Sequence, residues 1–361
     1  MVASENFSYD TIFFIDSIGT HLSEVLCGTG ILANFILILL ILTKTPKYMK
    51  SYAILLLNFA FFDFWTCLAS LFACQKTIFS GFSLTYIFHG PCKFFGPSLC
   101  YFCHCFVCHS MAHSQWILLF SFIYRWRILK EDVMTIFQMI AASFAVYSCS
   151  FVVFLFYFLD RGDSNELLKI MSNLHPTYHY TNKTIWGNLT VSGNLTIFSL
   201  PSVTAIVYMT LPCVPIYVAI HYLRRKTLAI LSDSENTLNI SQLAKTSHRK
   251  LVKALTIQAT IPIFWLVASL IFTLAEFGII SGPIPEVITF RLMDCIPMLT
   301  PIVSMFFIAP YREGLVKVLR KSKVPIFGSE PRAQTVIEAT TARYLGEPRI
   351  LPNSSTTTTR A

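Results

Sequence analysis

The feature that most constrains this chain is a series of seven long stretches that are almost free of charge. A helix needs about 20 apolar residues to cross the roughly 30 Å of hydrocarbon in a bilayer. The predicted spans are residues 25–43, 51–74, 97–124, 133–159, 198–223, 254–275 and 287–309. Lipid cannot satisfy free backbone groups, so each span must be helical. We therefore predict an all-α membrane protein with a bundle of seven transmembrane helices.

Composition excludes other classes of protein. Of the 361 residues, 54% are hydrophobic and 13% are charged, whereas a soluble domain carries about a quarter charged residues. A chain of this length cannot hide such an apolar excess in one soluble core. This excludes an ordinary soluble enzyme, a disordered chain and a small disulfide-rich secreted domain.

The spans divide the chain into an N-terminal segment (1–24), the bundle (25–311) and a polar tail (312–361). The first 24 residues contain four acids and no Lys or Arg, so no cleavable signal peptide is expected. After Pro310, apolar and basic residues alternate in clusters. This pattern predicts a short helix in the membrane interface, with a basic flanking segment as the alternative.

The distribution of charge predicts the orientation. With the N-terminus outside, the inner segments hold 22 of the 28 Lys and Arg residues and eight acids, whereas the outer segments hold six basic and ten acidic residues. This asymmetry follows the positive-inside rule. The net charge of +9 is therefore a membrane signal, and we expect no nucleic-acid partner.

Glycosylation sequons agree with this orientation. Asn6 lies in the N-terminal segment, and Asn182, Asn188 and Asn194 crowd the connection between the fourth and fifth spans. All four are predicted outside and are candidate glycosylation sites. The sequons at Asn239 and Asn353 would face the cytoplasm and should remain bare.

Polar residues inside predicted spans are candidate functional groups. Asp63 lies alone in the middle of the second span, and an intramembrane acid is functional by default. We expect it to join helices, with Asn34 and Asn58 as candidate partners. Arg291 and Asp294 stand three residues apart in the seventh span and are spaced to pair. Six prolines in or near the last three spans are either hinges or packing irregularities: Pro201, Pro212, Pro215, Pro262, Pro297 and Pro301.

The third span contains the string CYFCHCFVCH (residues 100–109). It holds C-x-x-C-H twice, a pattern of haem attachment, and Cys/His clusters bind zinc. These residues would lie along one helix rather than around a point, so we expect no metal and no cofactor. Residues of the third and sixth spans are instead candidates for lining a ligand cavity, with packing as the alternative: His104, Cys108, Met111, Phe264 and Trp265.

Several strings resemble a known family. SYAILLLNFAFFDFWTCLAS (51–70), HGPCKFFGPSLCYF (89–102) and SFIYRWRIL (121–129) resemble nematode serpentine receptors of class delta. KALTIQATIPIF (253–264) and TPIVSMFFIAPYR (300–312) are similar to the same family and to related classes within the str-like superfamily. The resemblance covers roughly residues 34–312.

The resemblance implies a G-protein-coupled chemoreceptor in the plasma membrane of chemosensory cilia. Its partners would be a small odorant or pheromone-like ligand and a heterotrimeric G protein, and it would not be an enzyme. The residues implied in coupling or switching are Asp63, Arg125, Pro262, Pro301 and Tyr311. Tyr124 stands where rhodopsin-like receptors have an acid, and Thr300 stands where they have Asn. The contacts that hold the inactive conformation must therefore differ from those of rhodopsin-like receptors.

The resemblance also raises a question of disulfide pairing. Many serpentine receptors join a cysteine at the entry to the third span to the loop after the fourth, but that loop contains no cysteine here. Cys74, Cys92 and Cys100 are the candidates for a bridge on the oxidising side, and their connectivity is left open.

Two other functions compete with the receptor. A polytopic transporter or channel is disfavoured because the chain shows no internal repeat. A membrane enzyme that uses the Cys/His string of the third span is the third alternative, and a stoichiometric metal in the purified protein would favour it.

Overall fold

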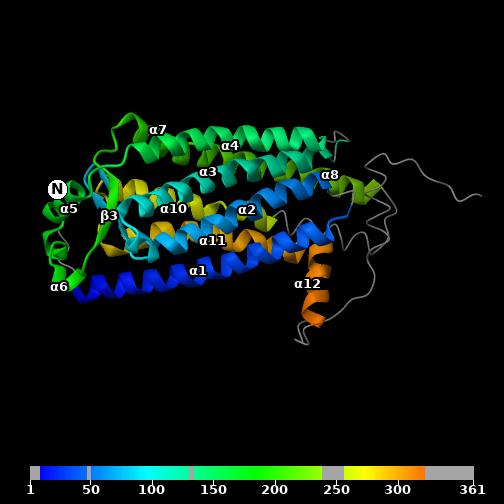
Figure 1. Cartoon of the computed structure of the whole chain (residues 1–361). Coiled ribbons are helices and arrows are strands. Elements are labelled where there is room, and N and C mark those ends of the chain that lie inside the picture. The colour runs from blue at the N-terminus through cyan, green and yellow to red at the C-terminus, as the bar shows by residue number, and fades with distance from the viewer. Residues whose placement is uncertain (1–8, 47–49, 129, 131–133, 238–255, 322–361) are drawn as a thin grey trace, which may run out of the picture.

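The computed structural model describes residues 9–46, 50–128, 130, 134–237 and 256–321. Within these ranges, seven helical segments are long and apolar enough to cross a membrane. They lie side by side in one bundle (Figure 1). The sequon at Asn6, most of the loop around residues 238–255 and the tail beyond Lys321 lie outside the described residues.

The spans have the following bounds. The first four are α1 (Tyr9–Lys44), α2 (Lys50–Ala73), α3 (Pro97–Ile128) and α4 (Ile136–Leu159). The fifth is built from α7 (Leu200–Thr210) and α8 (Cys213–Thr237). The sixth runs from Thr256 to Glu276 and includes α10 (Ile263–Glu276), and the seventh is α11 (Pro283–Phe307).

The first helix begins at Tyr9, well before the predicted start at residue 25. Residues 1–24 were predicted to be a segment that precedes the bundle, yet Asp16 of this segment is only 7% exposed. Its carboxylate accepts a hydrogen bond from Lys76, and Ile12 belongs to an apolar cluster that includes Ile78 and Ile87. The extra turns of α1 are thus held by contacts with the connections at this end of the bundle.

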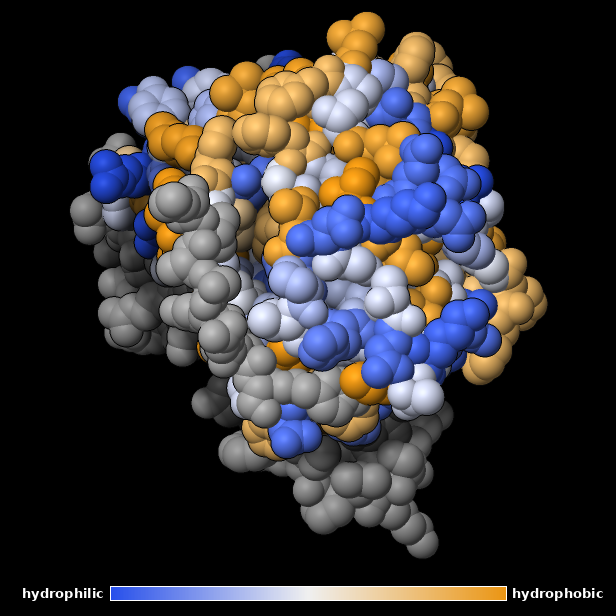
Figure 2. Space-filling view, turned by 90° about the vertical axis from the view of Figure 1, so that its left-hand side faces the viewer, coloured by the Kyte–Doolittle hydropathy of each residue, from blue (hydrophilic) through white to orange (hydrophobic). Residues whose placement is uncertain are grey.

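A folded cap covers that end of the bundle. Three antiparallel strands pair in the order β1-β2-β3, namely β1 (Gln75–Ser80), β2 (Ser83–Phe88) and β3 (Thr190–Asn194). Shorter elements complete the cap: η2 (Pro91–Phe94), α5 (Ser164–Leu174), η3 (Pro176–Tyr178) and α6 (Lys183–Trp186). Figure 2 looks onto this end and shows patches of hydrophilic residues, with hydrophobic residues toward the upper edge.

The hairpin of the cap has a local explanation. Ser80 pairs with Ser83 across a two-residue turn, and Gly81 takes a φ of +67°, a conformation that glycine adopts at little cost. A side chain on Gly193 would collide with the carbonyl of Leu84, so β3 needs glycine to approach β2. This sheet was not predicted from the sequence.

Four of the six prolines fall into two groups, whereas Pro201 and Pro215 lie in the first turns of α7 and α8. The fifth span is interrupted between α7 and α8, where Pro212 lies, and the sixth has a turn at Ile261 and Pro262. Pro297 and Pro301 instead lie inside the continuous helix α11. Interruptions therefore occur in two of the last three spans, as expected where proline removes a helical hydrogen bond.

The opposite end of the bundle carries α12 (Ala309–Lys321), which turns away from the bundle axis (Figure 1). Leu315 packs against an apolar cluster that includes Leu40 of α1 and Met305 of α11. The short helix expected after the seventh span is therefore present, and its place in the membrane interface stays a prediction.

Candidate functional site

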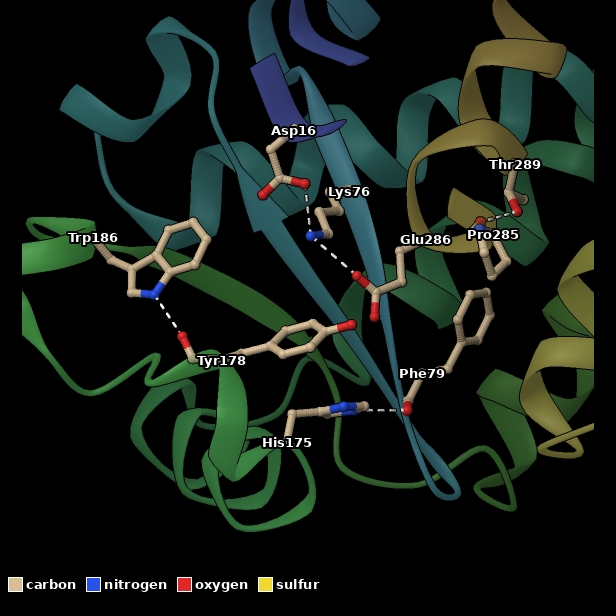
Figure 3. Close-up of polar contacts among 9 residues, drawn as sticks. All are labelled: Asp16, Lys76, Phe79, His175, Tyr178, Trp186, Pro285, Glu286 and Thr289. Atoms are coloured by element: carbon tan, nitrogen blue, oxygen red, sulfur yellow. Dashed lines mark hydrogen bonds and ion pairs between the residues drawn. The ribbon is translucent and has the colours of Figure 1, made fainter. Parts of the chain in front are cut away.

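A buried ion cluster joins three elements beneath the cap (Figure 3). Nζ of Lys76 in β1 lies 2.7 Å from Oδ1 of Asp16 in α1 and 3.0 Å from Oε2 of Glu286 in α11. The three side chains are nearly inaccessible to solvent, with exposures between 2% and 7%. Two carboxylates thus share one ammonium group, and the cluster fastens the cap to both helices.

Burial alone would lower the pKa of Lys76, but the charges of Glu286 and Asp16 and their hydrogen bonds outweigh it, so the pKa is raised. Lys76 therefore stays charged. The hydroxyl of Tyr178 points toward Glu286 (Figure 3), and its ring centroid lies 5.9 Å from Nζ of Lys76. None of these residues was predicted from the sequence, because the partners of Lys76 lie far away in the chain.

A second polar network lies deeper in the bundle. Arg291 and Asp294 pair at 3.2 Å, which confirms the predicted interaction. Ser70 of α2 donates to Asp294 at 2.6 Å, and Arg291 donates to the carbonyl of Gln75 at 3.0 Å. Both members of the pair are almost fully buried. Because their charges balance, α2, β1 and α11 meet here without an unpaired charge.

The residues proposed to line a ligand cavity are brought together only in part. His104 contacts the side chain of Gln75 at 2.9 Å and the thiol of Cys108 at 3.8 Å, and its ring packs 3.9 Å from that of Tyr86. Met111 and Trp265 belong to one apolar core cluster. Phe264 is half-buried and lies outside that cluster.

Asp63 does not contact the partners predicted for it. Its Oδ1 accepts a hydrogen bond of 3.2 Å from Ser114 of α3. Asn34 donates instead to the carbonyls of Gly30 and Pro297, each at 2.9 Å, and Asn58 bonds His113 at 2.9 Å. The prediction that Asn34 and Asn58 are hydrogen-bond partners of Asp63 is wrong, because the alignment of neighbouring helices could not be predicted from the sequence.

At the end opposite the cap, Arg125 of α3 is held by two helices. Its guanidinium donates to the hydroxyl of Tyr52 in α2 and, at 2.6 Å, to Oε1 of Gln258 in the sixth span. Tyr52 also stacks on Tyr124 with centroids 6.0 Å apart. Tyr311 is fully buried, and its hydroxyl lies 3.0 Å from that of Thr45.

A disulfide bond lies at the cap end of the bundle. Cys92 and Cys100 form a disulfide, whereas Cys74 is a buried free thiol. In the described part of the chain, no cluster of three or more His, Cys, Asp or Glu residues is arranged to hold a metal ion.

Asn194 is a poor acceptor for a glycan. It is 1% exposed, and its Nδ2, the atom a sugar would occupy, donates to the carbonyl and to Oδ2 of Asp160 at 3.0 and 3.2 Å. Its Oδ1 accepts from Tyr101 at 2.7 Å. Asn182 and Asn188 are exposed. Asn194 therefore has a role in packing, and its burial argues against the glycan expected there.

Comparison with known proteins identifies the family of this chain. Residues 20–317 match the family described as serpentine type 7TM GPCR chemoreceptor Srd. The chain is 60% identical over 326 residues to serpentine receptor class delta-1 of Caenorhabditis elegans, covering 90% of this chain and 87% of that protein. It is 54% identical over 330 residues to serpentine receptor class delta-2 of the same organism, covering 90% and 91%. The chain therefore belongs to the Srd family of seven-transmembrane chemoreceptors, as its resemblance to class delta implied.

Proposed function

We propose that this protein is a chemosensory receptor that binds a small odorant or pheromone-like ligand in the cap half of the bundle and activates a heterotrimeric G protein at the opposite end. The observation that carries the proposal is the position of Arg125. It lies at the end of α3 remote from the cap and bridges α2 and the sixth span.

A guanidinium in this position has two roles available. In the resting state its bonds to Tyr52 and Gln258 hold three helices together. When those helices separate, the same planar donor is free to bond carbonyls at the end of a docked G-protein helix. The turns at Pro212 and Pro262 supply flexible points in the fifth and sixth spans. We include Asp63, Pro301 and Tyr311 among the residues that take part in the change from the resting to the active conformation.

The ligand residues we propose are His104, Cys108, Met111, Phe264 and Trp265. The first two belong to the network below the cap, and Met111 and Trp265 share an apolar cluster. This half of the bundle joins apolar side chains to a few polar groups, which is the usual make-up of a small-molecule site.

Expression in cells with a panel of volatile and pheromone-like compounds tests this function. At least one compound should raise G-protein activity, and Arg125→Ala should abolish the response at unchanged surface expression. Trp265→Ala should raise the required concentration of ligand. An agonist response that Arg125→Ala leaves undiminished would refute the role of Arg125.

We also propose that the cap faces the exterior, in the plasma membrane of chemosensory cilia. The charge distribution of the connections and the exposed sequons at Asn182 and Asn188 support this orientation. An N-terminal tag should be stained on intact cells, and a C-terminal tag only after permeabilisation. The reverse pattern would refute it.

A further inference from the structure

One side of the cap exposes large apolar side chains although it lies outside the seven spans. Phe82 in the turn between β1 and β2 is 54% exposed, Leu174 at the end of α5 is 54% exposed, and Phe198 just before α7 is 66% exposed. With Leu195, these residues are called the apolar rim. A contiguous exposed patch of this kind marks a surface that binds a protein or a membrane.

Contacts show that the apolar rim is a single patch. The ring centroids of Phe82 and Phe198 lie 5.0 Å apart. Cδ1 of Leu174 lies 3.7 Å from the place that a side-chain carbon would occupy on Gly81, the neighbour of Phe82. The backbone N–H of Ile197 donates to the carbonyl of Phe82 at 2.8 Å. The hairpin turn and the segment that enters α7 therefore form one surface.

The segments that carry most of the apolar rim contain no charge. No Asp, Glu, Lys or Arg occurs between Thr77 and Cys92, which include the hairpin turn, or between Thr184 and Leu223. Turns that face water are rich in Gly, Pro, Asn, Asp and Ser, whereas Phe82 supplies half of this two-residue turn. An uncharged turn with an exposed aromatic ring is suited to an apolar environment.

The length of the fifth span places the apolar rim at the level of the lipid headgroups. The first charge toward the end opposite the cap is Arg224, and about 20 residues cross the hydrocarbon, so the hydrocarbon ends near Thr204 on the cap side. Phe198 precedes Thr204 by about six residues, which is about 9 Å at the helical rise of 1.5 Å per residue. The headgroup region is about 5–8 Å thick on each side, so the side chain of Phe198 lies within reach of the acyl chains.

The apolar rim also continues a surface that faces lipid. Leu200, Val203 and Val207 are 80%, 38% and 46% exposed, and their spacing of three and four residues places them along one side of α7. Phe198 comes directly before this row. Figure 2 shows hydrophobic residues gathered at the upper edge of the cap end, and α7 begins at that edge in Figure 1. Lipid that covers the row on α7 therefore reaches the rim without a gap.

We propose that the apolar rim is a membrane-binding surface, which inserts Phe82, Leu174 and Phe198 into the leaflet on the cap side of the bilayer. The partner is the boundary between the headgroups and the acyl chains of ordinary phospholipids. A particular headgroup is not required, because the rim itself has no charged residue. The cap is then held by the membrane as well as by α1 and α11. This inference goes beyond the proposed receptor function and holds whichever side of the membrane the cap faces.

Spin-label accessibility tests the proposal in the full-length receptor in phosphatidylcholine nanodiscs. Cys149, an exposed free cysteine, is first replaced through Cys149→Ser. A nitroxide is then attached to Phe82→Cys or to Phe198→Cys, each of which leaves the other ring in place. Collisions with oxygen, which concentrates in lipid, are compared with collisions with a water-soluble nickel chelate. Glu166→Cys, at an exposed position on α5 of the same cap, is the matched control.

We expect the ratio of oxygen to nickel collisions at positions 82 and 198 to be several-fold higher than at position 166. Equal ratios at the three positions would show that the rim faces water and would overturn the proposal. Low collision rates with both reagents would show that a protein covers the rim, which would also overturn it. Thermal unfolding shows which labelled variants are folded.

A second measurement uses the unaltered receptor, so it decides the matter if a cysteine variant does not fold. A phosphatidylcholine that bears a diazirine on the upper part of one acyl chain is incorporated into the nanodisc, and its adducts are mapped by mass spectrometry. Adducts on Phe82 and Phe198, with none on Glu166, are the expected result. Adducts confined to the spans would refute insertion of the rim.

Discussion

Nζ of Lys76 in β1 lies 2.7 Å from Oδ1 of Asp16 in α1, and both side chains are buried. The two residues are separated by 60 positions in the chain. Their contact stabilises the segment before the first predicted span as the beginning of α1. It also attaches β1, the edge strand of the cap, to this helix. Because Glu286 shares the same ammonium group, the seventh span is fastened at the same point.

Removal of this ammonium group should be costly. Lys76→Met keeps most of the side-chain volume but leaves two buried carboxylates without a counter-ion, and breaking a buried pair in this way costs about 3–5 kcal/mol. We expect a large fall in the thermal midpoint of the receptor in detergent. The exposed Lys93 provides the control, since Lys93→Met should change stability by only about 0.5 kcal/mol. Equal stability of the two variants would show that the cluster does not hold the cap.

His89 at the cap should make stability depend on pH. Burial lowers its pKa from 6.5 to about 4, so between these values the unfolded chain binds a proton that the folded protein does not. The free energy of unfolding therefore falls as the pH falls from 6.5 toward 4, by at most about 3 kcal/mol from this residue. His89→Gln should flatten the profile in this window, while the exposed His21→Gln should not. Parallel profiles for wild type and His89→Gln would contradict the assignment.

The three sequons of the connection between the fourth and fifth spans should differ in use. Thr184→Ala and Thr190→Ala, which destroy the sequons of the exposed Asn182 and Asn188, should each remove the mass of one glycan. Thr196→Ala destroys the sequon of the buried Asn194 and should remove none. Gel mobility before and after enzymatic deglycosylation measures this, and a mass loss in Thr196→Ala would show that Asn194 is modified.

Loosening the contacts of Arg125 should raise basal activity. Gln258→Leu removes a hydrogen bond to a charged group, worth about 1.5–3 kcal/mol, and so shifts the resting equilibrium about tenfold or more toward the active state. Tyr52→Phe should act in the same direction. Basal G-protein activation at matched surface expression is the measurement, with the exposed Thr260→Val as control. Unchanged basal activity in both variants would mean that these bonds do not restrain the receptor.

The sequence predicted best what local composition determines. Charge-free stretches of the necessary length predicted seven spans, because the bilayer permits little else there. The pairing of Arg291 with Asp294 followed from their spacing of three residues on one helix. The short helix beyond the seventh span was expected from its clusters of apolar and basic residues.

Contacts between distant segments could not be predicted from the sequence. The partner of Asp63 depends on how α2 and α3 are aligned, and Ser114 carried no signal that distinguished it from Asn34 or Asn58. The β1–β2 hairpin did leave a trace, since two short runs rich in Thr, Ile and aromatic residues flank Gly81. That pattern is typical of a two-residue turn, but β3 and α1 complete the cap from far along the chain.

Ligand binding in this bundle should be converted into G-protein activation. The most direct measurement is nucleotide exchange on a purified heterotrimeric G protein, with the receptor in nanodiscs and compounds that bind it added in turn. We expect that at least one such compound accelerates exchange and that Arg125→Ala removes the acceleration while binding persists. Saturable binding that accelerates exchange on no class of G protein would contradict it.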